Sequence, residues 1–181
     1  MPFKASPWQI PGLLLIEGRS FPDERGFFME SAREDELRAL GLPPLVQDNL
    51  SRSKKGVLRG LHFQKPPMPV GKLVRCLRGK IFDVAVDLRR SSPSFGQWAS
   101  VELSDEGNRM FWIPAGFAHG FCVLSDLADV MYKVTDHWKP EVDGGIRWND
   151  PALAIPWPQQ RPVLTAKDAA LPLLAEAGSL F

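Results

Sequence analysis

The most regular feature of the chain is an alternation of apolar and polar positions over short runs, a pattern typical of β-strands. In the clearest run, residues 80–88, one face is formed by Phe82, Val84, Val86 and Leu88. The opposite face of this run comprises Ile81, Asp83, Ala85 and Asp87. Shorter runs predict further strands at residues 73–77, 98–103, 110–113, 121–124 and 130–134. With 17 prolines and 15 glycines punctuating such runs, the sequence predicts an all-β chain.

Signals for helices are few. Ser31, followed three residues later by a glutamate, fits the start of a helix that Gly41 would end. A second short helix is expected in the Pro-rich C-terminal tail of residues 151–181, where Thr165 and Asp168 form a similar starting pair. We therefore expect only a few short helices at the periphery of the sheets.

Length and charge bound the kind of protein. A chain of 181 residues can bury a sizeable core, so we expect one domain over residues 1–181. The net charge of +1 provides no strong field towards nucleic acid or a membrane, and neither is expected as a partner. Basic residues nevertheless cluster within residues 52–80. They are either solvated strand edges or part of a pocket for an anionic small molecule.

The cysteines and the longest apolar runs indicate the compartment. Cys76 and Cys122 lie in apolar, strand-like runs, which favours buried, reduced thiols over a disulfide. The apolar run at residues 13–16 is far too short to span a bilayer, and the N-terminus lacks a signal-like apolar region. We expect a cytoplasmic enzyme.

Two of the three histidines follow glycine-bearing turns within strand-like sequence. The order Pro114-x-Gly116-x-x-His119 is the one that a cupin-type antiparallel β-barrel, or jelly roll, uses to turn a strand edge and aim an imidazole inward. Cupins that bind a metal carry His-x-His in the first block, where this chain has His62-Phe-Gln64. The pattern therefore favours acid–base chemistry over a metal site, and no metal or cofactor is expected.

His62 is the candidate general base, because an imidazole can take and return a proton near neutral pH. The alternative is a histidine whose hydrogen bonds are satisfied at the mouth of the barrel. A base of this kind needs a carboxylate to fix its tautomer. Asp83, Asp87 and Asp168 are all candidates, and their spacing does not choose among them. Asp168 has a purely structural alternative as well, at the start of the C-terminal helix.

Three further side chains could complete acid–base chemistry. Tyr132 is the only tyrosine beside 11 phenylalanines, which suggests a role for its hydroxyl as proton donor, although a core tyrosine is equally compatible. Lys72 could stabilise an oxyanion, or could simply be solvated. Arg59 could clamp a phosphate, but in a regular strand it would face away from His62 unless Gly60 kinks the chain.

Several ordered motifs resemble one enzyme family. They are Arg59-Gly-Leu-His62-Phe-Gln64, Gly71-Lys72-Leu-Val-Arg75, Asp83-Val-Ala-Val-Asp87, Ile113-Pro-Ala-Gly-Phe-Ala-His-Gly120, Tyr132-Lys133 and Ile146-Arg-Trp-Asn-Asp-Pro151. Together they resemble the dTDP-4-dehydrorhamnose 3,5-epimerase family over about residues 18–168. The resemblance implies a cofactor-independent cupin homodimer that inverts C3 and C5 of dTDP-4-dehydro-6-deoxy-D-glucose and gives dTDP-4-dehydro-L-rhamnose.

The same resemblance implies roles for individual residues. His62 would be the base, Asp168 its orienting carboxylate, Lys72 the enolate stabiliser and Tyr132 the proton donor. Residues 1–30 would contact the partner subunit and reach its active site, with contacts from Arg25, Phe28 and Glu30. The contacts to substrate and pyrophosphate would come from Gln47, Asp48, Asn49, Arg59, His119 and Lys167. From the residues alone, the segment that contains Arg25 is either this arm or an ordinary hairpin.

Three positions depart from the family pattern. Trp138 stands where a tyrosine usually stacks on thymine, Asp143 stands where glutamate is usual, and Thr165 replaces a serine. An indole can also stack, so recognition of the base is expected to survive. Three alternatives stay open: an epimerase acting at only one carbon, a metal-dependent cupin oxygenase, and a non-catalytic sugar-binding cupin.

Overall fold

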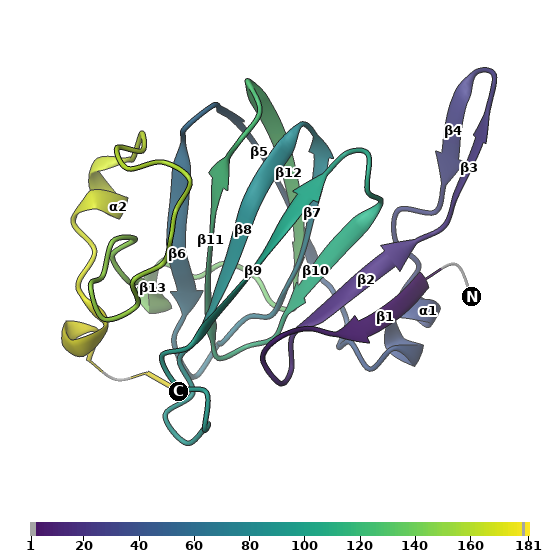
Figure 1. Cartoon of the computed structure of the whole chain (residues 1–181). Helices are drawn as coiled ribbons and strands as arrows, with labels where there is room; N and C mark the ends of the chain where they lie inside the picture. The colour runs from purple at the N-terminus through teal and green to yellow at the C-terminus, as the bar shows by residue number, and fades with distance from the viewer. Residues whose placement is uncertain (1–2, 179) are drawn as a thin grey trace.

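Two antiparallel sheets face each other in the computed structural model, which describes residues 3–178 and 180–181 (Figure 1). The larger sheet has the order β1 (Phe3–Pro7), β2 (Leu14–Gly18), β10 (Arg109–Ile113), β7 (Lys72–Arg78), β12 (Leu127–Val134) and β5 (Gln47–Lys54). The smaller sheet has the order β13 (Asp143–Gly145), β6 (Leu58–Gln64), β11 (Phe117–Val123), β8 (Lys80–Asp87) and β9 (Trp98–Ser104). This architecture confirms the predicted all-β jelly roll.

Strand β8 shows how the apolar alternation builds this fold. Ile81 and Ala85 point inward, to the core between the two sheets. Val84 and Val86 point the other way and pack beneath the C-terminal segment, residues 151–181. Both faces are therefore buried, as expected of a strand inside a sheet. The strands predicted from alternation all exist, but the one expected at 121–124 begins earlier, at Phe117.

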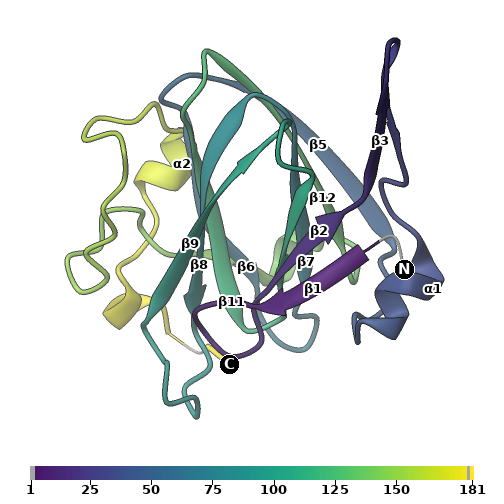
Figure 2. The ribbon, with the colours of Figure 1, turned by 45° about the vertical axis from the view of Figure 1, so that its right-hand side comes forward.

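The C-terminal segment covers the outer face of the smaller sheet (yellow in Figures 1 and 2). Trp157 and Leu180 pack there against side chains of the sheet. The segment contains the short helix α2 (Ala166–Ala169), which confirms the helix expected in the tail, and the 3-10 turn η2 (Leu174–Glu176). A second 3-10 turn, η1 (Pro140–Val142), leads into β13.

A hairpin of β3 (Ser20–Asp23) and β4 (Gly26–Met29) projects from the body of the molecule (Figures 1 and 2). We call it the arm. Phe27 and Phe28 are 64% and 69% exposed on it. With Phe21, 45% exposed, they form a group of exposed aromatic side chains on the arm.

Helix α1 (Glu34–Ala39) starts later than the sequence predicted. The N-cap residue is Arg33, not Ser31, and it makes no side-chain capping hydrogen bond. Arg33 instead forms an exposed ion pair with Asp35, and it is the acidic side chains of the first turn, Glu34, Asp35 and Glu36, that interact favourably with the helix dipole. Gly41 follows the helix with φ +87°, as predicted for a glycine that ends a helix.

Two remaining expectations concern the thiols and the membrane. Cys76 and Cys122 are buried, free thiols as predicted, and burial raises the pKa of each to about 11. None of the helices in the described ranges is both long enough and apolar enough to cross a bilayer.

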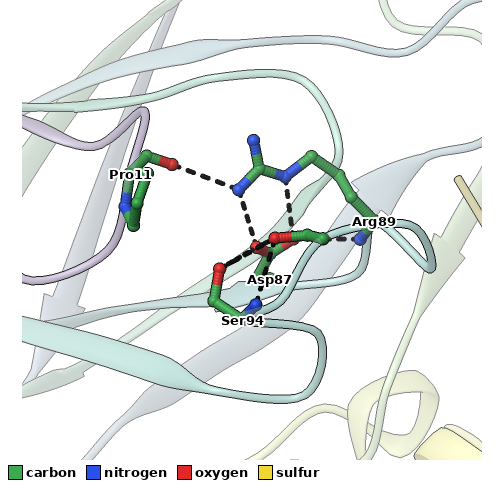
Figure 3. Close-up of polar contacts among 5 residues, drawn as sticks. Pro11, Asp87, Arg89 and Ser94 are labelled. Carbon is green, nitrogen blue, oxygen red and sulfur yellow. Dashed lines mark hydrogen bonds and ion pairs between the residues drawn. The ribbon is translucent and has the colours of Figure 1, made fainter.

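Asp87 is the centre of a buried polar cluster that ties three parts of the chain together (Figure 3). Its carboxylate accepts hydrogen bonds from the Arg89 guanidinium at 2.6 and 2.8 Å and from Ser94 Oγ at 2.7 Å. The same guanidinium donates to the Pro11 carbonyl at 3.1 Å. The Ser92 hydroxyl also donates to the Asp87 carboxylate, at 2.8 Å. Burial alone would raise the pKa of Asp87, but the hydrogen bonds from Arg89, Ser94 and Ser92 outweigh it and lower the pKa to about 2.

We expect Asp87→Asn to lower the free energy of unfolding by about 3 kcal/mol at pH 7, because Arg89 loses its buried partner. The folded pKa of about 2 lies below the ordinary 3.8. The stabilisation is therefore complete above about pH 4 and is lost as the pH falls towards 2. Urea unfolding across this range should show the gap between variant and wild type narrowing. Asp126→Asn is the control, since its side chain is 98% exposed and its loss should leave the midpoint unchanged.

Candidate active site

Two adjoining cavities lie between the sheets and share the side chains of His62, Lys72, Tyr132 and Lys167. Their volumes are about 210 and 260 Å³. His62 lies on β6 of the smaller sheet, whereas Lys72 and Tyr132 lie on β7 and β12 of the larger sheet. An imidazole therefore lies on one wall of the cavities, and an ammonium and a phenol lie on the other.

Of the three candidate carboxylates, Asp168 is the one that contacts His62. The His62 Nε2 and Asp168 Oδ1 atoms are 2.7 Å apart. Asp168 is 3% exposed, and burial would raise its pKa, but the hydrogen bond and charge of His62 outweigh burial and lower it. The Asp168 backbone N–H also donates to Thr165 Oγ1 at 3.1 Å. Asp168 thus both belongs to the helix start and contacts the imidazole.

Asp83 and Asp87, the other two candidates, serve different residues. Asp87 belongs to the cluster around Arg89, and Asp83 Oδ2 lies 2.9 Å from His119 Nε2. His119 and His62 are direct partners in the β11–β6 ladder, so two carboxylate–imidazole pairs stand side by side. Burial lowers the pKa of His119 and raises that of Asp83, because it disfavours the charged form of each group.

Lys72 and Tyr132 face the His62 pair from the opposite wall. Lys72 Nζ donates to the His62 carbonyl at 3.2 Å and lies 6.0 Å from the centre of the Tyr132 ring. Burial lowers the pKa of Lys72 to about 8, against the opposing charges of Asp83 and Asp143. Burial also raises the pKa of Tyr132, so its phenol holds its proton. A protonated phenol and an ammonium are suited to donate to a substrate.

Arg59 reaches the same cavity as His62 because Gly60 interrupts the strand. Gly60 has φ +123°, and the register of β11 with β6 shifts opposite it, between His119 and Phe121. A Cβ at residue 60 would lie 2.5 Å from the Gly120 Cα, so only glycine fits. Arg59 and His62 therefore both line the second cavity. The kink that the sequence left open is present.

The first cavity extends away from Arg59 towards a partly open end. Gln47, Asn49, Trp138, Asp143 and Lys167 line it. Trp138 is 57% exposed, and the Lys167 ammonium forms an ion pair with the Asp143 carboxylate. An exposed indole beside charged and amide groups can stack on a planar ring while polar groups bind its edges.

Four predicted site residues lie outside both cavities. Asp48 is on the other face of β5, where its carboxylate binds Lys133 Nζ at 2.6 Å. Arg25 and Phe28 are on the exposed arm, Arg25 in an ion pair with Asp23. Glu30 follows the arm and lies 3.7 Å from an Arg33 nitrogen. Within one chain these residues do not meet His62.

Some basic residues of the cluster at 52–80 line the cavities, and others lie on solvated strand edges. Arg59 and Lys72 line the cavities, as an anion pocket would need. Arg52 instead binds Asp129 at 2.6 Å and Lys55 lies 3.5 Å from Asp126, both on the surface.

Several residues that line the cavities were not predicted. Gln64, noted only because it replaces a histidine, is buried and donates to the carbonyls of Met68 and His137 at 3.0 and 3.3 Å. It therefore holds two loops beside the first cavity. The others are Ser51, Phe63, Val70, Phe121, Val134 and Asp136. Strand periodicity from Gln47 and Asn49 could have indicated Ser51, since alternate residues share a face.

The arrangement can perform proton transfer on a carbon acid. It contains an imidazole oriented by a carboxylate, an ammonium that can stabilise an oxyanion, and a protonated phenol on the opposite wall. No three His, Cys, Asp or Glu side chains of residues 3–178 and 180–181 come together as a metal site would require.

The chain is similar to several known proteins over most of its length. The dTDP-4-dehydrorhamnose 3,5-epimerase of Salmonella typhimurium is 54% identical over 171 residues, 93% of each chain. The crystal structure of the dTDP-6-deoxy-D-glucose-3,5-epimerase of Legionella pneumophila, in complex with dTDP-4-keto-L-rhamnose, superposes with a TM-score of 0.92 at 51% identity, over 96% of this chain and 94% of that one. The dTDP-4-dehydrorhamnose 3-epimerase of Streptomyces niveus is 40% identical over 94% of this chain and 84% of its own.

The sequence profile that describes dTDP-4-dehydrorhamnose 3,5-epimerases matches residues 7–176, nearly the whole of both sheets and the C-terminal segment. That span includes the His62–Asp168 pair and the Lys72 and Tyr132 side chains opposite it. The chain therefore belongs to the dTDP-4-dehydrorhamnose 3,5-epimerase family.

Proposed function

We propose that the chain inverts C3 and C5 of dTDP-4-dehydro-6-deoxy-D-glucose to give dTDP-4-dehydro-L-rhamnose. One observation supports this reaction above all others. His62, the proposed base, and its hydrogen-bond partner Asp168 lie on one wall of the cavity, and Tyr132 lies on the other. Inversion at carbon needs a proton to leave from one face and return to the other, so acid and base must flank the sugar ring.

The chemistry follows from the C4 ketone, which acidifies the protons on C3 and C5. His62 removes one of these protons, and the buried Asp168 carboxylate stabilises the imidazolium that forms. The electrons move to the C4 oxygen, where Lys72 stabilises the enolate. Tyr132 then donates a proton to the carbon from the opposite face. Proton exchange with water restores His62 and Tyr132 before the second carbon reacts.

The remaining site residues bind the nucleotide and its diphosphate. Trp138 stacks on thymine at the open end of the first cavity, beside Gln47 and Asn49. The Lys167–Asp143 ion pair lies at the same end and contacts the substrate there. Arg59 provides positive charge for the diphosphate, and His119 contacts the substrate next to it.

The arm supplies further contacts in a homodimer, in which Arg25, Phe28 and Glu30 reach the active site of the partner subunit. The exposure of Phe27 and Phe28 supports this, because an aromatic side chain loses its unfavourable contact with water when a partner covers it. The free thiols of Cys76 and Cys122 support a cytoplasmic location for the enzyme.

Mixed dimers test the arm directly. An Arg25→Ala/Phe28→Ala variant and a His62→Ala variant should each be nearly inactive alone. Mixing equal amounts should restore about one quarter of wild-type activity, because half of the dimers are then mixed and each has one complete site. Turnover is measured after subunit exchange. Activity of the mixture no higher than the sum of its components would show that the arm serves its own chain.

The reaction itself is tested by NMR of dTDP-4-dehydro-6-deoxyglucose incubated in D2O with the EDTA-treated protein. Deuterium at both C3 and C5, with inverted products, is the expected result. Deuterium at one carbon would make the protein a single-centre epimerase, the second candidate, since the chain is also 40% identical to a 3-epimerase. Exchange that appears only after metal is added would overturn the cofactor-independent mechanism.

A further inference from the structure

Strand β5 presents a row of polar side chains to the cavities. Gln47 and Asn49 line the first cavity and Ser51 lines the second, while Ser53 follows on the same face. These four positions alternate with the outward-facing residues of the strand, so they share the inner face. A polar inner row is unusual in a jelly roll, whose inward positions normally build the core.

Three of the four side chains in this row have partners within the protein. Gln47 Nε2 donates to Asn49 Oδ1 at 2.9 Å, and Gln47 Oε1 accepts from the Trp138 backbone N–H at 3.3 Å. Ser53 Oγ accepts from Arg59 Nε at 2.9 Å, which holds the guanidinium at the end of the second cavity. These contacts give each of the three residues a structural role.

Ser51 is the exception. Its Oγ is buried and has no hydrogen-bond partner among the described residues. Leaving a buried hydroxyl unpaired is unfavourable, and an alanine at this position would avoid the penalty. The hydroxyl therefore makes no hydrogen bond within the described residues that an alanine would lose. Its side chain lines the cavity together with Arg59, His119 and Tyr132, and rotation about χ1 turns the Oγ towards what binds there.

We propose that Ser51 is a substrate-positioning residue, whose hydroxyl donates a hydrogen bond to an oxygen of the bound sugar nucleotide beside Arg59. The acceptor is either a diphosphate oxygen or an oxygen of the hexose. Arg59 lines the same cavity as Ser51, and an anionic diphosphate oxygen held there would accept a short hydrogen bond from the hydroxyl, whereas a hexose oxygen would accept an ordinary one. This inference rests on the proposed function, since it assumes that a sugar nucleotide occupies the cavity.

The test is Ser51→Ala, with Ser100→Ala as its matched control. Ser100 is also a half-buried serine in a strand, but it lies on β9 and lines neither cavity, and its hydroxyl makes no hydrogen bond to the described residues. Three quantities are measured for each variant: the thermal midpoint, the Kd for dTDP, and kcat and KM for the dTDP-4-dehydro sugar. The thermal midpoint of Ser51→Ala should equal or exceed that of the wild type, because no protein hydrogen bond is lost.

A rise of about tenfold in the Kd for dTDP would place the hydrogen bond on the diphosphate. An unchanged Kd with a fall of about tenfold in kcat/KM would place it on the hexose. If both values match those of Ser100→Ala, or if the midpoint of Ser51→Ala falls below that of the control, the proposal is wrong. If the wild-type protein binds dTDP but does not epimerise the sugar, the proposed function is wrong. The role of Ser51 would still be tested in that case, by the Kd for dTDP of Ser51→Ala.

Discussion

Replacement of His62 by alanine is expected to abolish epimerisation at both carbons while dTDP still binds almost as tightly as to the wild type. His62 is the imidazole paired with a buried carboxylate at 2.7 Å and placed against the cavity shared with Lys72 and Tyr132. Loss of a general base costs about 10² to 10⁴ in rate. We expect nucleotide binding to be retained, because the proposed nucleotide end of the site, at Trp138, does not depend on the imidazole.

Turnover of the His62 variant is measured by NMR of the product and its affinity by titration with dTDP. Deuterium uptake from D2O at C3 and C5 should disappear together with turnover, because the imidazole that removes both protons is gone. Asp168→Asn is the companion variant: it keeps the size of the side chain but lets the imidazole adopt the wrong tautomer. Its rate should also fall steeply. Wild-type turnover in His62→Ala would disprove the assignment of the base.

Tyr132→Phe should separate proton removal from inversion. The substitution removes only a hydroxyl, and the ring still packs against the core between the sheets. The base remains, so protons on the carbons beside the ketone continue to exchange with solvent. Without a donor on the opposite wall, His62 returns the proton to the face it came from. Inverted product should therefore fall by about 100-fold.

The measurement compares two signals in one NMR experiment: deuterium incorporation and the appearance of inverted product. In the wild type they rise together, and in Tyr132→Phe incorporation should outpace inversion at one carbon at least. The affinity for dTDP is the control and should stay unchanged. Inversion at the wild-type rate would mean that another group or water is the donor.

The fold was predictable where alternation reports burial. Strand β8 is buried on both faces and was recognised, because its two apolar sets face two different cores. Strand β5 was not predicted. Its inner face is polar because it lines the cavities and its outer face is exposed at a sheet edge, so no apolar period marks it. The polar side chains that obscure the strand in the sequence are the ones that line the cavities.

The site was predictable in its residue types but not in its pairings. Asp168 lies 106 positions from His62, and nothing local distinguishes it from Asp83 or Asp87. Only the path of the C-terminal segment decides the choice. Likewise, the placement of Arg59 beside His62 depends on the close approach of Gly60 to Gly120, a contact between separate strands.

The hydrogen-bonded pair that we propose as the base joins two parts of the molecule, since His62 belongs to the sheet and Asp168 to the segment that covers it. With this assignment, we expect activity to require that the segment is docked. A brief local opening would leave the jelly roll folded but the base without its carboxylate. Catalytic competence should then follow the free energy of this local opening and not that of global unfolding. Heat inactivation would begin below the temperature at which the sheets melt, and amide hydrogen exchange in α2 would report it.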